Sequence, residues 1–175
     1  MSRPDYDLTL YLVTDRASLG GRDLLDVVGR AAAGGARLVQ LREKRLGSRE
    51  FVELARAMAG LVRSLGARLV INDRVDVALA CDADGVHVGQ DDMRPADVRA
   101  LIGPDRLLGL SVTGEDEVLA ARGEPVDYLG AGPIFATATK TDAGPPQGIA
   151  GLGRMIALAE APVVTDGSEA VPEGR

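Results

Sequence analysis

The sequence is poor in cysteine and in aromatic residues, and both shortages narrow what the protein can be. Cys81 is its one cysteine, so no disulfide can form within the chain, as is typical of a reducing compartment. Aromatic residues make up 3% of the chain, too few to build stacking platforms for single-stranded nucleic acid. The formal net charge of −6 also disfavours nucleic acid, because its phosphates require a basic surface. We expect no nucleic-acid partner.

Long apolar runs are also missing. No segment approaches the roughly 18 apolar residues that a membrane-spanning helix needs. The first ten residues, MSRPDYDLTL, carry charges where a secretory signal would need an apolar run. We therefore expect a cytoplasmic protein with no membrane partner.

The chain does contain an alternation of short apolar runs with amphipathic helix patterns. The runs, rich in Val, Leu and Ile, are typical of parallel strands buried on both faces. They cover residues 8–15, 36–42, 67–73, 83–89, 107–112, 127–134 and 161–167. Helices are predicted at about 22–33, 48–65, 74–81, 95–102, 114–122 and 148–160. Ser48 is the expected N-cap of the clearest helix and Gly66 its stop, while Thr113 with Asp116 resembles a capping box.

Strict alternation of strands and helices predicts a parallel α/β fold. An open doubly wound sheet and a closed barrel both satisfy the periodicity. The first strand runs into VTDRASLGGRD, which lacks the Gly-x-Gly-x-x-Gly turn of a dinucleotide-binding fold. This absence favours a TIM-barrel-type (β/α) domain, which we predict over residues 1–164.

Polar residues gather at or just after the predicted strand ends. In a parallel barrel these ends lie on one face, where active sites are built. The residues at these ends are Thr14, Asp15, Gln40, Arg42, Glu43, Lys44, Asn72, Asp73, His87, Gln90, Asp91, Asp92, Ser111, Thr137, Thr139 and Lys140. No Ser/His/Asp or Cys/His set typical of nucleophilic catalysis is visible in the sequence.

The charged members of this set suit a magnesium–diphosphate site. Arg42, Lys44 and Lys140 are cations able to bind phosphate, Arg as a bidentate fork and Lys as a point charge. Asp73 and Asp92 are hard oxygen ligands at adjacent strand ends. Together with a substrate phosphate they suit Mg²⁺, which rarely takes an all-protein cage.

The neutral members suit the rest of a substrate. Asn72 and Ser111 can hydrogen-bond a polar heterocycle or a diphosphate oxygen. Thr137 and Thr139, beside Lys140, could bind a second anion through hydroxyl and backbone N–H groups. The set therefore predicts a second phosphate site beside the first.

Each of these residues also has a plainer interpretation. Arg42 and Lys44 could be solvated surface charges. Asp73 and Asp92 could cap the helices that follow them. We expect His87 to be a hydrogen-bonded structural histidine rather than an acid–base group. The convergence of the set on one barrel face is what favours a site.

Five segments of the chain are similar to one known family. They are LYLVTDR, VQLREK, VINDRVDVALACDADGVHVGQDDM, GLSV and DYLGAGPIFATATKTDA, within residues 8–164. In this order and spacing they resemble the thiamine phosphate synthase family. The resemblance implies a (β/α)-barrel transferase and allows for a homo-oligomer. The implied reaction condenses 4-amino-2-methyl-5-(diphosphooxymethyl)pyrimidine with a thiazole phosphate, giving thiamine monophosphate and pyrophosphate.

The resemblance also implies roles for single residues. It implies that the pyrimidine diphosphate is held by Gln40, Arg42, Lys44, Asn72, Ser111 and Lys140. It implies Mg²⁺ as cofactor, with Asp73 and Asp92 as ligands, and contacts of Thr137 and Thr139 with the thiazole phosphate. Arg42, Lys44 and Lys140 would be catalytic by neutralising the charge of the leaving diphosphate, without a general base.

The sequence departs from the family after APVV (161–164). The remaining TDGSEAVPEGR lacks the expected glycine turn, helix and eighth strand. We therefore expect a disordered tail over 165–175 and a barrel of about seven strands, without its last βα unit and with unpaired edges on its first and last strands. Two other functions stay open: a thiazole tautomerase-like isomerase, and a barrel that binds ligand without turnover. The retained magnesium–diphosphate set counts against the isomerase.

Overall fold

A computed structural model describes residues 6–135 and 145–165 of the chain. Its strands form one sheet in which neighbours in sequence are neighbours in space. They are β1 (Tyr11–Val13), β2 (Leu38–Leu41), β3 (Arg68–Asn72), β4 (Gly85–Val88), β5 (Leu107–Val112), β6 (Tyr128–Ala131) and β7 (Val163–Thr165). The helices are η1 (Arg16–Leu19), α1 (Leu24–Ala33), α2 (Ser48–Ser64), α3 (Val75–Ala80), α4 (Pro95–Ile102), α5 (Glu115–Ala120) and α6 (Gly148–Leu158).

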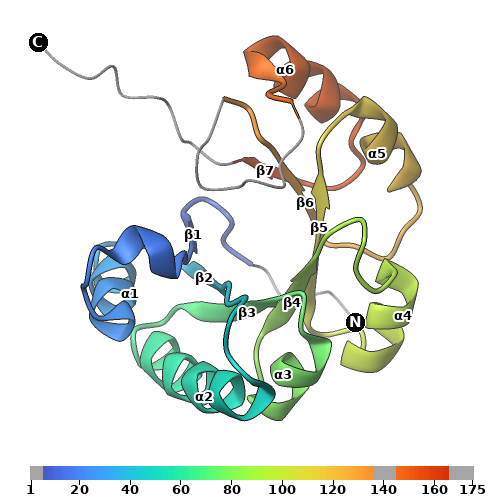
Figure 1. Cartoon of the computed structure of the whole chain (residues 1–175). Coiled ribbons are helices and arrows are strands. Elements are labelled where there is room, and N and C mark those ends of the chain that lie inside the picture. Colours follow the sequence, from blue (N-terminus) through green and yellow to red (C-terminus); the bar gives the residue numbers. More distant parts are fainter. Residues whose placement is uncertain (1–5, 136–144, 166–175) are drawn as a thin grey trace, which may run out of the picture.

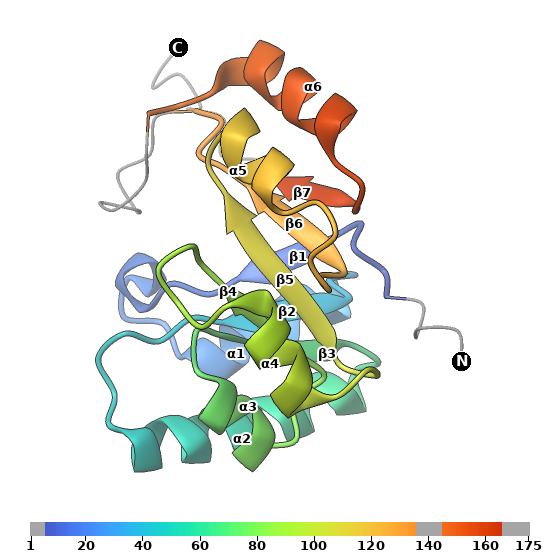
Figure 2. The same cartoon turned by 90° about the vertical axis from the view of Figure 1, so that its right-hand side faces the viewer.

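All seven strands pair in parallel and curl around a common interior, with the helices outside (Figure 1). The view from the side shows the same layering (Figure 2). The predicted α/β barrel type is therefore confirmed, with seven strands within the described residues. In that part of the chain β1 pairs with β2 alone and β7 with β6 alone, as the sequence predicted.

The sheet separates two apolar regions because successive side chains along a strand point to opposite faces. The larger region lies between the sheet and the helices and includes the α2 stripe of Phe51, Met58 and Val62. The smaller lies inside the curl and is built around Leu38 and Tyr128. Among the helices of the described residues, none is both long and apolar enough to cross a lipid bilayer.

The ends of α2 agree with the sequence at one terminus only. Gly66 has a left-handed backbone, φ 72, and follows the last helical turn as predicted. The prediction that Ser48 is the N-cap is wrong, because Gly47 occupies that position. The Ser48 hydroxyl instead accepts a hydrogen bond from Arg74 Nη2 at 2.8 Å. A tertiary partner has replaced the local one.

The predicted capping box of α5 is also wrong. The N-cap of this helix is Gly114, which has no side chain to accept a capping hydrogen bond. Thr113 is tied to Glu117 rather than to Asp116, since the Glu117 carboxylate accepts from Thr113 N at 2.6 Å and from its hydroxyl at 3.0 Å. Glu117, the third residue of the helix, thus binds the residue before the N-cap, and no side-chain hydrogen bond caps the helix.

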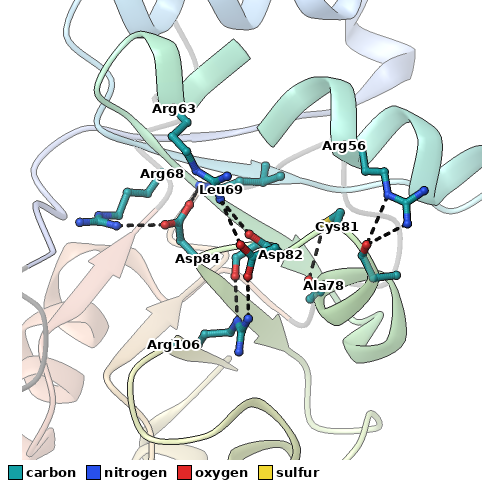
Figure 3. A network of polar contacts seen from close by, with 11 residues as sticks. Arg56, Arg63, Arg68, Leu69, Ala78, Cys81, Asp82, Asp84 and Arg106 are labelled. Carbon is teal, nitrogen blue, oxygen red and sulfur yellow. Dashed lines mark hydrogen bonds and ion pairs between the residues drawn. The ribbon is translucent and has the colours of Figure 1, made fainter. Parts of the chain in front are cut away.

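A polar network joins the amino ends of β3 and β4 (Figure 3). Asp84, just before β4, accepts a hydrogen bond from Leu69 N at 2.9 Å and another from Arg68 Nη1 at 3.0 Å. Asp82 pairs with Arg106 at 2.7 Å. The network lies at the strand ends opposite to the predicted site, so it can fix strand register without contributing to the site.

Candidate active site

The predicted residues that the structure describes follow the pattern expected of a barrel. They lie in the carboxyl halves of β2 to β5 or in the loops that follow these strands, on one face of the barrel. These residues are Gln40, Arg42, Lys44, Asn72, Asp73, Asp92 and Ser111. Thr137, Thr139 and Lys140 lie outside the described residues.

The segment after β2 is held in place by the end of β1. Thr14 is buried, its N–H donates to Gln40 O at 2.9 Å, and its hydroxyl accepts from Arg42 N at 3.0 Å. The Glu43 carboxylate accepts a hydrogen bond from Arg16 Nε at 2.7 Å, outside the predicted site. Arg42 is thus presented from an anchored backbone and is itself half-buried. Lys44, two residues further along, is exposed.

Asp73 and Asp92 form a carboxyl pair. Burial raises the pKa of Asp73 to about 6, and a hydrogen bond and repulsion from Asp92 add to the shift. Lys44 and Arg42 act on the same pKa in the opposite direction. Two carboxyls and two cations, from the ends of three different strands, are therefore close enough to interact.

The backbone around this pair excludes the helix-cap interpretation. Helices α3 and α4 have Arg74 and Arg94 as N-caps, without a side-chain cap hydrogen bond. Asp73 adopts a left-handed backbone, φ 62, which is uncommon outside glycine and clusters at functional sites. Asp92 Oδ2 accepts from Gly89 N at 2.7 Å. Both carboxyls are held toward the strand ends rather than toward the helices.

A chain of hydrogen bonds runs through the interior of the barrel beneath this site. Gln40 Nε2 donates to Tyr11 Oη at 2.8 Å, and Tyr11 Oη shares a hydrogen bond of 2.7 Å with Tyr128 Oη. Tyr128 Oη lies 2.9 Å from His87 Nδ1, and His87 Nε2 lies 2.8 Å from Ser111 Oγ. We call these five residues the interior chain. The prediction that His87 is hydrogen-bonded is confirmed, and its structural rather than acid–base role stays a prediction.

Sequence reasoning missed the two tyrosines of this chain. Tyr128 is fully buried, and room for its ring comes from Gly109 on the neighbouring strand. A Cβ added at Gly109 would overlap Tyr128 Cζ and His87 Nδ1, and one at Gly130 would lie 2.9 Å from His87 Cε1. Glycines inside strands often mark such close approaches. That was the available signal.

The fold and the site together define a class: a (β/α)-barrel protein that presents paired carboxyls and nearby cations at the carboxyl ends of its strands. The family model described as thiamine monophosphate synthase matches residues 10–169. The chain belongs to this family.

Relatives and solved structures agree with this assignment. A thiamine-phosphate synthase of Solidesulfovibrio magneticus is 85% identical over 161 residues, which cover 92% of this chain and 76% of that protein. One of Xanthobacter autotrophicus is 57% identical, over 82% of this chain and 68% of that protein. The structure of a thiamine phosphate pyrophosphorylase from Pyrococcus furiosus superposes with a TM-score of 0.80 at 36% identity, covering 91% of this chain and 75% of that one.

Proposed function

We propose that the protein condenses 4-amino-2-methyl-5-(diphosphooxymethyl)pyrimidine with a thiazole phosphate to give thiamine monophosphate and pyrophosphate. The carbon–oxygen bond to the diphosphate breaks and a bond from that carbon to the thiazole nitrogen forms. The observation that carries the proposal is the Asp73–Asp92 pair interacting with Arg42 and Lys44, in a chain that belongs to the thiamine monophosphate synthase family.

Each site residue that the structure describes has a role in this reaction. Arg42 and Lys44 bind the diphosphate and neutralise charge that grows on it as it leaves, which is electrostatic stabilisation. Gln40, Asn72 and Ser111 orient the pyrimidine diphosphate by hydrogen bonds. We propose the same diphosphate role for Lys140, and thiazole-phosphate contacts for Thr137 and Thr139.

The donor set fits Mg²⁺ as a cofactor. Among residues 6–135 and 145–165, no group of three or more His, Cys, Asp or Glu side chains is placed to hold a metal ion. Mg²⁺ commonly takes one or two carboxylates and completes its shell with water and substrate phosphate. Asp73 and Asp92 would supply those carboxylates. When bound, the ion would add positive charge beside the diphosphate.

An assay of product formation separates this function from its alternatives. We expect thiamine monophosphate from the two substrates only when Mg²⁺ is added. Isomerisation of the thiazole phosphate, indifferent to Mg²⁺, would instead support a tautomerase-like isomerase. Binding of both substrates without product would support a protein that binds without turnover. Either result would contradict the transferase proposal.

The metal role has a matched pair of variants. Asp92→Ala should abolish Mg²⁺-dependent turnover while the circular dichroism spectrum stays native. Asp91→Ala removes the neighbouring carboxylate, which is exposed like Asp92 but is not among the groups that shift the pKa of Asp73, and it should leave turnover within about twofold. Equal activity in the two variants would remove Asp92 from the proposed metal site.

A further inference from the structure

The interior chain connects two residues proposed to touch substrate, Gln40 and Ser111, through Tyr11, Tyr128 and His87. Ser111 is half-buried at the carboxyl end of β5, whereas Tyr128 lies fully buried beneath it. Burial raises the pKa of Tyr11 to about 12 and that of Tyr128 well above its ordinary value. Both hydroxyls are therefore neutral at physiological pH, and each has one hydrogen to donate.

The direction of the hydrogen bonds follows from the first donor. Gln40 Nε2 donates to Tyr11 Oη, so Tyr11 uses its own hydrogen toward its other described partner, Tyr128 Oη. Tyr128 then has His87 Nδ1 as the remaining described acceptor for its hydrogen. A buried hydroxyl hydrogen without an acceptor is costly.

The opposite direction leaves one donor unused. If Tyr128 donated to Tyr11, the Tyr11 oxygen would accept two hydrogen bonds. Its own hydrogen would then have no acceptor among the described partners of the interior chain. Only the first direction lets both tyrosine hydroxyls donate.

We propose that Tyr128 is a positioning residue: by donating to His87 Nδ1 it fixes the Nε2–H tautomer, so that His87 donates to Ser111 Oγ and the Ser111 hydroxyl hydrogen is directed at an acceptor atom of the substrate. The identity of that substrate, the pyrimidine diphosphate, rests on the proposed function. The tautomer assignment rests on the geometry alone. Ser111 then acts as a donor suited to a diphosphate oxygen or a ring nitrogen.

The tautomer can be read directly, because His87 is the one histidine of the sequence. Nitrogen NMR of the histidine-labelled protein should show a protonated Nε2 and an acceptor Nδ1. Tyr11→Phe should keep this tautomer, since Tyr128 can still donate to Nδ1. Tyr128→Phe should shift the Nδ1 resonance as its hydrogen bond disappears. A native Nδ1–H tautomer or an imidazolium would overturn the proposal, and this measurement requires no variant to fold.

Turnover tests whether the tautomer matters. Tyr128→Phe should lower kcat/KM for the pyrimidine diphosphate about tenfold, the size of one net hydrogen bond. In a Ser111→Ala background the same change should have almost no effect, because Tyr128 acts through Ser111. Tyr6→Phe is the matched control: its hydroxyl bonds Asp105 O at 2.8 Å, outside the interior chain, and its activity should be native.

Two outcomes of the kinetic test would overturn the positioning role. One is a native kcat/KM in folded Tyr128→Phe. The other is the full tenfold loss persisting in the Ser111→Ala background. If the native protein forms no thiamine monophosphate, the proposed function fails, while the tautomer measurement still decides the positioning role on its own.

Discussion

At the scale of single residues, Gly109 shows how a missing side chain makes room for the barrel interior. A Cβ at this position would overlap the rings of Tyr128 and His87. Overpacking of a tight core typically costs 1–3 kcal/mol. We expect Gly109→Ala to lower the free energy of unfolding by about 3 kcal/mol, as measured by urea denaturation.

A second glycine supplies the control for this prediction. Gly60 lies within α2, and a Cβ there would meet nothing within 4 Å. Gly60→Ala should therefore raise the free energy of unfolding by about 0.5–1 kcal/mol, because alanine is the better helix former. Equal effects of the two substitutions would contradict the tight fit assigned to Gly109.

The buried tyrosines predict a loss of stability at alkaline pH. Burial raises the pKa of Tyr11 to about 12 and that of Tyr128 well above its ordinary value, against about 10 in the unfolded chain. Above pH 10 the unfolded chain releases protons that the folded chain retains, so stability falls as pH rises. The slope should be about 1.4 kcal/mol per pH unit for each such tyrosine.

Absorbance of tyrosinate and circular dichroism, followed together, would test this. Most of the tyrosinate signal should appear with unfolding, between about pH 10 and 12. Tyr128→Phe should make the pH dependence shallower. Ionisation of all three tyrosines near pH 10 in a folded protein would be incompatible with the buried interior chain.

At the scale of elements, a carboxylate one residue before a strand accepts a hydrogen bond from the backbone N–H near the start of a neighbouring strand. Asp84 does so before β4. Asp127 repeats the device before β6, where it accepts from Leu108 N at 2.7 Å and from Arg99 Nη2 at 2.6 Å. The Arg99 and Asp127 side chains are only 14% and 11% exposed. This pair therefore lies in a far less polar setting than an ordinary surface ion pair.

The Arg99–Asp127 pair, which we call the clamp, predicts that substitutions of two arginines have unequal effects on stability. Arg99 also donates to Pro125 O and Gly103 O, so Arg99→Ala would remove the cation paired with the Asp127 carboxylate and the donor to these carbonyls. We expect a loss of about 3–5 kcal/mol. Arg30→Ala, at a site that is 80% exposed and paired with Asp26, should cost less than about 1 kcal/mol. Thermal and urea unfolding of both variants would measure the contrast, and similar losses would refute the clamp.

Helix ends show where local sequence reasoning stops. Gly66 was predicted correctly because a left-handed backbone is a local requirement. Ser48 was not, because its hydroxyl serves Arg74, far along the chain. A capping side chain in a sequence names a hydrogen-bonding group but not its partner.

At the scale of the whole molecule, ligand binding should couple to stability. If Mg²⁺ and the diphosphate share the site of Asp73, Asp92, Arg42 and Lys44, neither should bind well alone. Pyrimidine diphosphate with Mg²⁺, at about a hundredfold the dissociation constant, should stabilise the fold by about 2.7 kcal/mol. The rise in Tm should be much smaller for either component alone.

The variant Asp92→Ala tests whether the coupling of Mg²⁺ and diphosphate binding depends on Asp92. Asp92→Ala should lose the Mg²⁺-dependent part of the Tm shift and retain a small shift from the diphosphate alone, because Arg42 and Lys44 remain. An unchanged shift in this variant would place the metal elsewhere. Differential scanning calorimetry, with inorganic diphosphate as a second probe, provides the measurement.

The sequence by itself determined the alternation of strands and helices, and with it the barrel type. It also named the polar residues at the strand ends, such as Gln40, Asn72 and Ser111. Both follow from local rules: side-chain periodicity sets the elements, and parallel strands place their carboxyl ends on one face.

Only the tertiary structure decided which of these residues touch one another. It paired Asp73 with Asp92, removed Glu43 from the site by binding it to Arg16, and set Tyr128 beneath His87. The physical reason is distance along the chain. Tyr128 and His87 are 41 residues apart, and no local pattern encodes a contact made only when the sheet curls and Gly109 leaves the space for it.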